Sequence, residues 1–292
     1  MKKRKTLQEL TIKDNFMFGA VMSIEENCIA FLELVLGFQI AQVRISKEKS
    51  LIYHPEYKGV RLDIYAEDEK NTHYNVEMQV KKKSELGKRS RYYHSQIDME
   101  CLLSGSEYEV LPNTFVIFVC DFDPFGMQHY CYTFSSCCEE IGELRLDDGR
   151  RTIFLSTKGK NVEEVPKELV KFLQFVEADL GESEIDFGDC LVKQFQKSVQ
   201  SIKKSREMGE RYMIFEEMMR DERNEGRMEA TRENIFELLE DVGEIPDELR
   251  NSIENVTDLQ ILKNILKIAS RTDSVETFVA GIEPVLVQKE EN

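Results

Sequence analysis

Residues 59–67 read GVRLDIYAE and residues 73–80 read HYNVEMQV, and both stretches alternate between apolar and polar side chains. Successive side chains of a strand point to opposite faces, so this alternation predicts two strands. The polar segment AEDEKNT lies between them and predicts a turn, which would join the strands as an antiparallel hairpin. Asp63 and Glu77 are then expected on the polar faces of neighbouring strands.

The sequence on either side of this hairpin predicts a sheet with helices packed around it. NTFVIFVCDFD holds a nearly continuous apolar run at Thr114–Cys120, which indicates a central strand buried on both faces. The other expected elements are a helix over 14–37 with a weak point near Ser23 and a C-cap at Gly37, a strand at Val43–Leu51, a helix over 84–104, a strand at His129–Phe134, and a short strand after the turn Asp147–Gly149. This order predicts an α/β fold with three layers, α/β/α.

Beyond about residue 162 the apolar residues recur at helical spacing, and no repeat period is evident. The segment RDERNEGRMEATRE is dense in charge, as expected for a long solvated helix. We therefore expect two parts, a sheet-containing domain over residues 1–182 and a charged, mostly helical extension over residues 183–292. The helices of the extension are candidates for contacts that form a homodimer.

Charge is distributed unevenly along the 292 residues, whose formal net charge is −16. Residues 1–100 hold 17 Lys or Arg against 15 Asp or Glu, whereas the remainder holds 22 against 40. The acidic total argues against broad, nonspecific binding of nucleic acid, but it leaves room for binding by the more basic first part. The acidic second part is expected to face solvent or a protein partner.

Cysteine spacing and hydropathy indicate a cytoplasmic protein. The seven cysteines form no CxxC pair, and most lie in apolar context, so we expect reduced, buried thiols. The vicinal pair Cys137–Cys138 could react, although a structural role is expected. The basic start MKKRKTLQEL is not followed by a long apolar stretch, so neither a signal peptide nor a membrane span is predicted.

Asp63 and Glu77 are the residues most suggestive of chemistry. Glu77 and Gln79 share a face of their strand, and Asp63 can join them from the paired strand. Two converging carboxylates repel each other, and Mg²⁺, which prefers oxygen ligands, relieves this repulsion and can activate water near a phosphate. Charged residues at alternate strand positions can equally just face water. There is no P-loop, GxGxxG or GxSxG motif, so no nucleotide cofactor is expected.

Longer stretches of the sequence resemble the PD-(D/E)XK nuclease superfamily, and within it the bacterial Rpn group of recombination-promoting nucleases, often labelled transposases. The similar segments are KDNFMFGAVM, FLELVLG, RLDIYAED, YNVEMQV, the span GKRSRYYHSQIDMECLLSGSEYEVLPNTFVIFVCDFDPF, and LDDGRRTIFLST. The resemblance covers residues 10–180 well and the tail more loosely. It implies a restriction-endonuclease-like core and hydrolysis of DNA with Mg²⁺, with Mn²⁺ as a substitute.

The resemblance also assigns roles to individual residues. Asp63 matches the metal-binding aspartate, Glu77 matches the second acidic ligand, and Gln79 stands where the wider superfamily has lysine. Leu62, rather than proline, precedes Asp63. Gln79 carries no positive charge, although it can still orient a water, and the Rpn group commonly has glutamine here.

A third acidic ligand and a DNA-binding surface complete the expected site. Many superfamily members add a carboxylate from the first helix, for which Glu33 is the candidate and Glu25 the substitute, although the sequence favours an exposed helix glutamate for either residue. A basic cluster directly follows the second strand and would bind phosphate. The expected nucleic-acid-binding residues are Lys81, Lys82, Lys83, Lys88, Arg89, Arg91, Tyr92 and Gln96.

Two functions from different classes follow. The first is a metal-dependent DNA endonuclease associated with recombination or mobile elements, with Asp63, Glu77 and Gln79 as its catalytic residues. The second is a nuclease-fold protein that no longer cuts and acts as a regulatory or protein-interaction module, which the missing lysine and the acidic C-terminal part favour.

Overall fold

A computed structural model describes residues 5–51, 60–82 and 84–287 of the chain. It divides into two compact units, residues 1–209 and 210–292. The division falls later than residue 182, where the sequence suggested it, because the helix after that point packs into the first unit. Phe195 of this helix contacts Phe172, with ring centroids 5.3 Å apart, and Phe172 in turn contacts Phe31.

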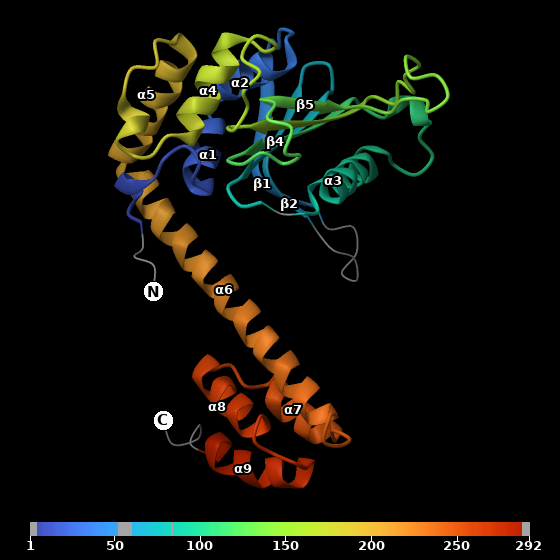
Figure 1. The fold of residues 1–292 in the computed structure, drawn as a ribbon, viewed down its shortest axis with the longest axis vertical. Helices are drawn as coiled ribbons and strands as arrows, with labels where there is room; N and C mark the ends of the chain where they lie inside the picture. Colours follow the sequence, from blue (N-terminus) through green and yellow to red (C-terminus); the bar gives the residue numbers. More distant parts are fainter. Residues whose placement is uncertain (1–4, 52–59, 83, 288–292) are drawn as a thin grey trace. The chain divides into compact units, whose positions relative to one another are not determined.

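A six-stranded sheet forms the centre of the first unit, in the order β1-β2-β3-β4-β6-β5 (Figure 1). Its strands are β1 (Val43–Leu51), β2 (Val60–Asp68), β3 (His73–Gln79), β4 (Thr114–Cys120), β5 (Cys131–Phe134) and β6 (Arg150–Ser156). Strands β1, β2 and β3 pair antiparallel, as predicted for the hairpin, whereas β3, β4 and β6 are parallel and β5 closes the edge antiparallel to β6. Every residue of β4 is buried, which confirms the interpretation of its apolar run.

Helices cover both faces of this sheet (Figure 1), so the α/β fold with three layers is confirmed. One face carries α1 (Asn15–Met22), α2 (Glu25–Leu36), α4 (Lys167–Glu177) and α5 (Cys190–Lys204), and the other carries α3 (Leu86–Cys101). The predicted first helix is interrupted at Ser23, whose hydroxyl donates to the carbonyl of Gly19. Gly37 ends α2 in the left-handed conformation expected of a C-cap.

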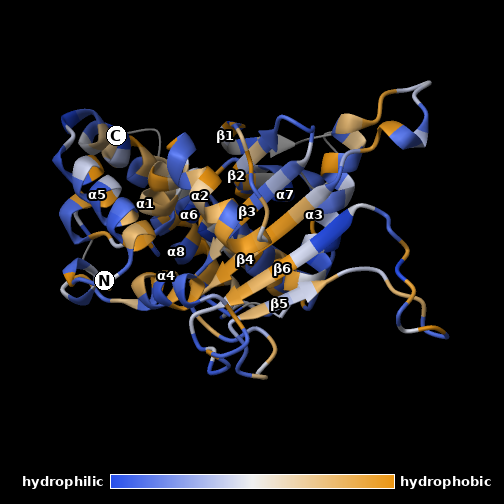
Figure 2. Ribbon diagram, turned by 90° about the horizontal axis from the view of Figure 1, so that it is seen from above, coloured by the Kyte–Doolittle hydropathy of each residue, from blue (hydrophilic) through white to orange (hydrophobic). Residues whose placement is uncertain are grey.

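Short 3-10 turns at Leu7–Glu9, Tyr108–Val110 and Glu182–Glu184 complete the first unit. Figure 2 shows the hydrophobic colouring concentrated on the central strands, β4 above all. Strand β4 lies in the middle of the parallel part of the sheet, between β3 and β6. Two neighbouring parallel strands need a crossover connection, and α3 provides the one between β3 and β4. The covering helices then remove both faces of β4 from water.

The second unit is helical and has its own core. It contains most of α6 (Arg206–Glu240), followed by α7 (Asp247–Glu254), α8 (Leu259–Ala269) and α9 (Val275–Val287). The end of α6 contributes Ile235 and Leu239 to this core, where they pack with Ile253, Ile265 and Phe278, all fully buried. The long charged helix and the helical extension predicted from the sequence are therefore present. Each described helix is too short or too polar to cross a lipid bilayer.

All seven cysteines are free thiols, as expected from their spacing. Cys28 and Cys120 are buried, and burial raises the pKa of both thiols to about 12. The expectation of burial is wrong for Cys137 and Cys190, which are exposed. Cys137 lies in the segment that joins β5 to β6, and Cys190 is the first residue of α5, so neither position is covered by another element.

Candidate active site

The hairpin β2–β3 brings Asp63 and Glu77 together on the face of the sheet that α3 covers. The register pairs Ile64 with Val76 and Tyr65 with Asn75, and one further step places Asp63 opposite Glu77. Each carboxylate accepts a hydrogen bond from the other strand. Glu77 Oε1 accepts from the backbone N–H of Asp63 at 3.2 Å, and Asp63 Oδ2 accepts from the N–H of Met78 at 3.2 Å.

Glu77 is fully enclosed, with only 2% of its surface exposed. The sequence suggested a strand with one polar face toward water, but every residue of β3 is buried. The reason is α3, which returns over the polar face: Tyr93 of α3 stacks on Phe118 of β4, the residue paired with Glu77. Strand β3 alternates between apolar and polar residues in sequence, but both of its faces are buried, and Glu77 lies on the polar face.

Arg89, in the first turn of α3, is the counter-charge of this site. Its guanidinium donates to Glu77 Oε2 at 3.1 Å, to Gln79 Oε1 at 3.0 Å and to the hydroxyl of Tyr93 at 2.6 Å. Tyr93 lies four residues after Arg89, which places both on one side of the helix. This pair explains how a glutamate and a glutamine can be buried next to each other without leaving their oxygens unpartnered.

Burial raises the pKa of Glu77 to about 8, and the nearby charge of Asp63 adds to the shift. The N–H of Asp63, the Arg89 guanidinium and the Asn75 amide act in the opposite direction, because they stabilise the ionised form. Glu77 is therefore a carboxylic acid that resists ionisation as long as no further cation is near. A strongly shifted carboxyl group under a helix is a recognised mark of a functional site.

The oxygens around Glu77 fit a hard divalent cation. Mg²⁺ is commonly held by one or two carboxylates, with water and substrate phosphate completing its ligands. Asn75, two residues before Glu77, donates from Nδ2 to Glu77 Oε1 at 3.2 Å, while its Oδ1 is buried and has no hydrogen-bond partner. A buried acceptor without a donor, beside two carboxylates, is a position that a cation or its water can satisfy. Asp63 and Glu77 would be the ligands.

Glu33 does not join this pair. Its Oε1 accepts a hydrogen bond from the N–H of Ile40 at 2.8 Å, at the end of the turn that follows α2. Glu25 likewise accepts from the N–H of Val43 at 3.4 Å. Across the described part of the chain, no group of three or more His, Cys, Asp or Glu side chains could hold a metal ion. The third acidic ligand expected from the first helix is therefore not found. Its two candidates instead accept hydrogen bonds from backbone N–H groups of Ile40 and Val43, just before β1 and at its start.

The residues expected to bind nucleic acid lie in different environments. Lys81, Lys82, Lys88 and Arg91 are exposed, and Tyr92 is half-buried. Arg89 is engaged with Glu77 and Gln79, as described above, and Gln96 is buried with 7% of its surface exposed. Lys83 lies outside the described residues. The cluster therefore separates into exposed cations near the end of β3 and residues that support the site from within.

Two residues of the site had no role assigned from the sequence. Tyr93 was expected only as part of the apolar stripe of its helix, and its i, i+4 spacing from Arg89 was the available signal. Asn75 was expected on the polar face of its strand, and its position two residues before Glu77 places it next to that carboxyl group. Both side chains hydrogen-bond to Glu77, Tyr93 at 3.5 Å.

One comparison with known proteins places the chain in a family. No match was found among curated proteins or among solved structures. A family model described as PD-(D/E)XK nuclease family transposase matches residues 12–229, which include the whole sheet, α3 and the acidic pair. This match covers most of the chain and agrees with the resemblance seen in the hairpin. The chain belongs to the PD-(D/E)XK nuclease family transposases.

Proposed function

We propose that this chain is a divalent-metal-dependent DNA endonuclease that acts in recombination or on mobile elements. The observation that carries the proposal is Glu77, a buried carboxyl group with a raised pKa, placed across a strand pair from Asp63. A hydrophobic residue would fill this space at lower cost, since burying an acid requires compensating partners. The family match and the exposed lysines beside β3 support DNA as the substrate.

In this proposal Asp63 and Glu77 would hold Mg²⁺, and the cation would supply an activated water and a positive charge beside the scissile phosphate. Gln79 orients the attacking water. Its Oε1 accepts from Arg89, so its Nε2 is the group that would donate to the water oxygen. The water would lose a proton to solvent and add to phosphorus, and one P–O ester bond would break, with the leaving sugar oxygen taking up a proton from solvent to become a hydroxyl. Mn²⁺ would substitute for Mg²⁺, because it also takes oxygen ligands.

Arg89 takes a different part before and after the cation binds. Before binding, its guanidinium donates to Glu77 Oε2 at 3.1 Å and supplies the positive charge beside that carboxyl group. With a divalent cation held by the two carboxylates, the Arg89 guanidinium would be free to donate to the phosphate, where a planar, permanently charged group can stabilise the transition state. Its side chain is 26% exposed, so such a movement does not require the helix to open.

The contact of Arg89 with Glu77 and Gln79 also favours a second candidate, a nuclease fold that does not cut and binds a partner instead. In that case the guanidinium would permanently occupy the place of the cation. Cleavage by the purified chain distinguishes the two functions.

The test is incubation of supercoiled plasmid with the full chain and either Mg²⁺ or Mn²⁺, followed by electrophoresis. We expect nicking or linearisation that falls at least about 100-fold in Asp63→Asn, since a lost metal ligand removes several kcal/mol of transition-state stabilisation. The matched control is Glu69→Gln, which removes one negative charge from the exposed turn of the same hairpin. Equal rates in Asp63→Asn and the control, or no cleavage by the wild type over a range of metal and salt concentrations, would refute the endonuclease proposal.

A further inference from the structure

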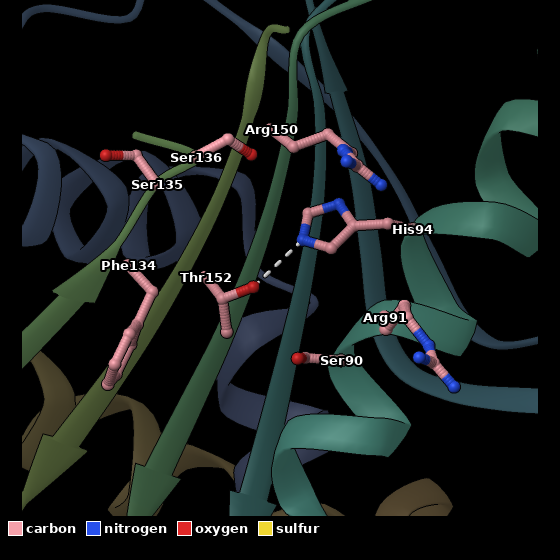
Figure 3. A pocket seen from close by; sticks show the side chains of 8 residues that line it. All are labelled: Ser90, Arg91, His94, Phe134, Ser135, Ser136, Arg150 and Thr152. Atoms are coloured by element: carbon pink, nitrogen blue, oxygen red, sulfur yellow. Dashed lines mark hydrogen bonds between the residues drawn. The ribbon is translucent and has the colours of Figure 1, made fainter. Parts of the chain in front are cut away.

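A polar cavity separate from the acidic pair lies on the α3 side of the sheet, between that helix and strands β5 and β6 (Figure 3). Its volume is about 210 Å³, and its lining includes Ser90, Arg91, His94, Phe134, Arg150 and Thr152. Pockets that enclose drug-sized ligands have volumes of about 300–1,000 Å³, so this cavity would enclose only part of such a ligand, for example a phosphate group and a portion of the nucleotide that carries it. None of these residues contacts the carboxylates of Asp63 and Glu77 in the hydrogen bonds described above.

Two arginines give the cavity its charge. Arg91 projects from α3, and among the described residues no partner accepts a hydrogen bond from its exposed guanidinium or forms an ion pair with it. Arg150 projects from β6 toward the helix and donates from Nε and Nη2 to Asp148 Oδ2, at 3.1 and 2.9 Å. These bonds fix the orientation of the Arg150 side chain and leave Nη1 to donate to a ligand. Arg150 is thus paired with Asp148 and also interacts electrostatically with Asp98, whereas Arg91 has no carboxylate partner among the described residues.

His94 forms a neutral wall between them. Its Nδ1 lies 2.8 Å from the hydroxyl of Thr114, and its Nε2 lies 3.1 Å from that of Thr152 (Figure 3). Burial lowers the pKa of His94 to about 4, and the positive charge of Arg150 adds to the shift. Because the imidazole stays uncharged at neutral pH and both its nitrogens are occupied, the recognition of an anion here depends on the arginines.

Phe134 adds an apolar surface across the cavity from these cations (Figure 3). It is the last residue of β5, and its side chain is 48% exposed. The ring is held by contacts with Phe125 and Phe154, at centroid distances of 5.1 and 5.7 Å. A fixed, half-exposed aromatic ring at one side of a cavity that carries arginines at its other side can hold a base or sugar while the phosphate binds the cations.

We infer that this cavity binds one nucleotide unit of a nucleic-acid strand, with the phosphate between Arg91 and Arg150 and the sugar or base against Phe134. The inference rests on the proposed function, because it treats the strand as the one cleaved at the acidic pair. Thr152 pairs with Val116, which pairs with Asn75, so the cavity lies two strands away from β3. At about 4.8 Å per strand this is roughly 10 Å, a separation of about three nucleotides along a helix axis.

The direct experiment measures the binding of a fluorescently labelled oligonucleotide to the full chain in EDTA, where no cleavage occurs. Arg91→Glu is the main variant, since an exposed residue without partners can be changed without loss of folding, and Arg150→Gln is the second. The matched control is Arg151→Gln: this neighbour on β6 is exposed, and its guanidinium lies on the opposite face, 6.0 Å from the ring of Phe115.

We expect the Kd to rise about tenfold in Arg91→Glu and in Arg150→Gln, and the slope of log Kd against log salt to decrease by about one in each, because one phosphate contact is lost. Arg151→Gln should bind like the wild type. Unlabelled oligonucleotide should displace the labelled strand, whereas millimolar inorganic phosphate or a mononucleotide should not.

Three results would overturn the inference: no oligonucleotide binding by the wild type, equal affinity in Arg91→Glu and Arg151→Gln, or displacement by free phosphate, which would make the cavity a site for small anions. The plasmid assay separates this inference from the proposed function. If plasmid is cut but the arginine variants bind normally, the cavity assignment fails alone. If no plasmid is cut while binding depends on Arg91 and Arg150, the endonuclease proposal fails alone.

Discussion

Strand β3 has two faces that are equally buried and chemically opposite. Tyr74, Val76 and Met78 point away from α3 and are at most 2% exposed. On the other face Asn75 and Glu77 are also at most 2% exposed, yet they are polar. The apolar face is stable through its burial alone, whereas the polar face requires Arg89 and Tyr93 as partners. The difference indicates that the polar face is kept for its chemistry rather than for stability.

A polar substitution on the apolar face of β3 should lower the free energy of unfolding more than any other substitution proposed here. Val76→Asn places an amide among apolar neighbours without donors or acceptors for it, and we expect the free energy of unfolding to fall by about 3 kcal/mol. Urea denaturation followed by circular dichroism measures this loss. Glu77→Gln, at the next position of the same strand, is the matched control and should cost much less at pH 6. Similar losses in both variants would show that Glu77 contributes as much to stability as Val76, which would contradict the view that only the apolar face serves stability.

The polar face of β3 should make the stability of the folded chain depend on pH, because it holds Glu77 with a raised pKa, whereas the apolar face has no group that titrates near neutral pH. The pKa of Glu77 is about 8 in the folded chain and 4.5 ordinarily, so between these values the folded state holds a proton that the unfolded state has lost. Raising the pH therefore removes stability, and at about 1.4 kcal/mol per pKa unit over the roughly two units from pH 6 to the folded pKa, the loss between pH 6 and pH 9 is about 3 kcal/mol in EDTA. Glu77→Gln should show a flatter profile.

Thermal unfolding at several pH values checks this expectation. Mg²⁺ should raise the Tm of the wild type more at pH 8 than at pH 6, because the cation competes with the proton for Glu77, and it should have little effect on Glu77→Gln. A wild-type profile that runs parallel to that of the variant would contradict the raised pKa.

Tyr93→Phe should have the smallest effect. The change removes only the hydroxyl, which accepts from Arg89 at 2.6 Å, and keeps the ring stacked on Phe118. We expect a loss of about 1 kcal/mol, together with a lower apparent pKa for the pH-dependent step if the freed guanidinium turns toward Glu77. Tyr92→Phe on the same helix provides the comparison. A loss of several kcal/mol would mean that Tyr93 supports the core more than the site.

The sequence by itself determined the order of the elements in the sheet-containing unit, because each has a strong local signal. The alternation around Asp63 and Glu77, the turn between them and the apolar run at Thr114–Cys120 depend only on side-chain periodicity and turn chemistry. The pairing of Asp63 with Glu77 across the hairpin followed from the same periodicity. These signals lie within a few residues of each other in the chain.

Only the tertiary structure decided what surrounds this pair. The enclosure of Glu77 depends on α3 folding back over the sheet, and the roles of Arg89 and Tyr93 depend on which side of that helix faces β3. Glu33, which matched a third ligand by position in the chain, instead binds the backbone of Ile40. The cavity between Arg91 and Arg150 joins residues 59 positions apart, which no local pattern could bring together. Periodicity fixes the face of a side chain, but the packing of distant elements fixes its partners and its exposure to water.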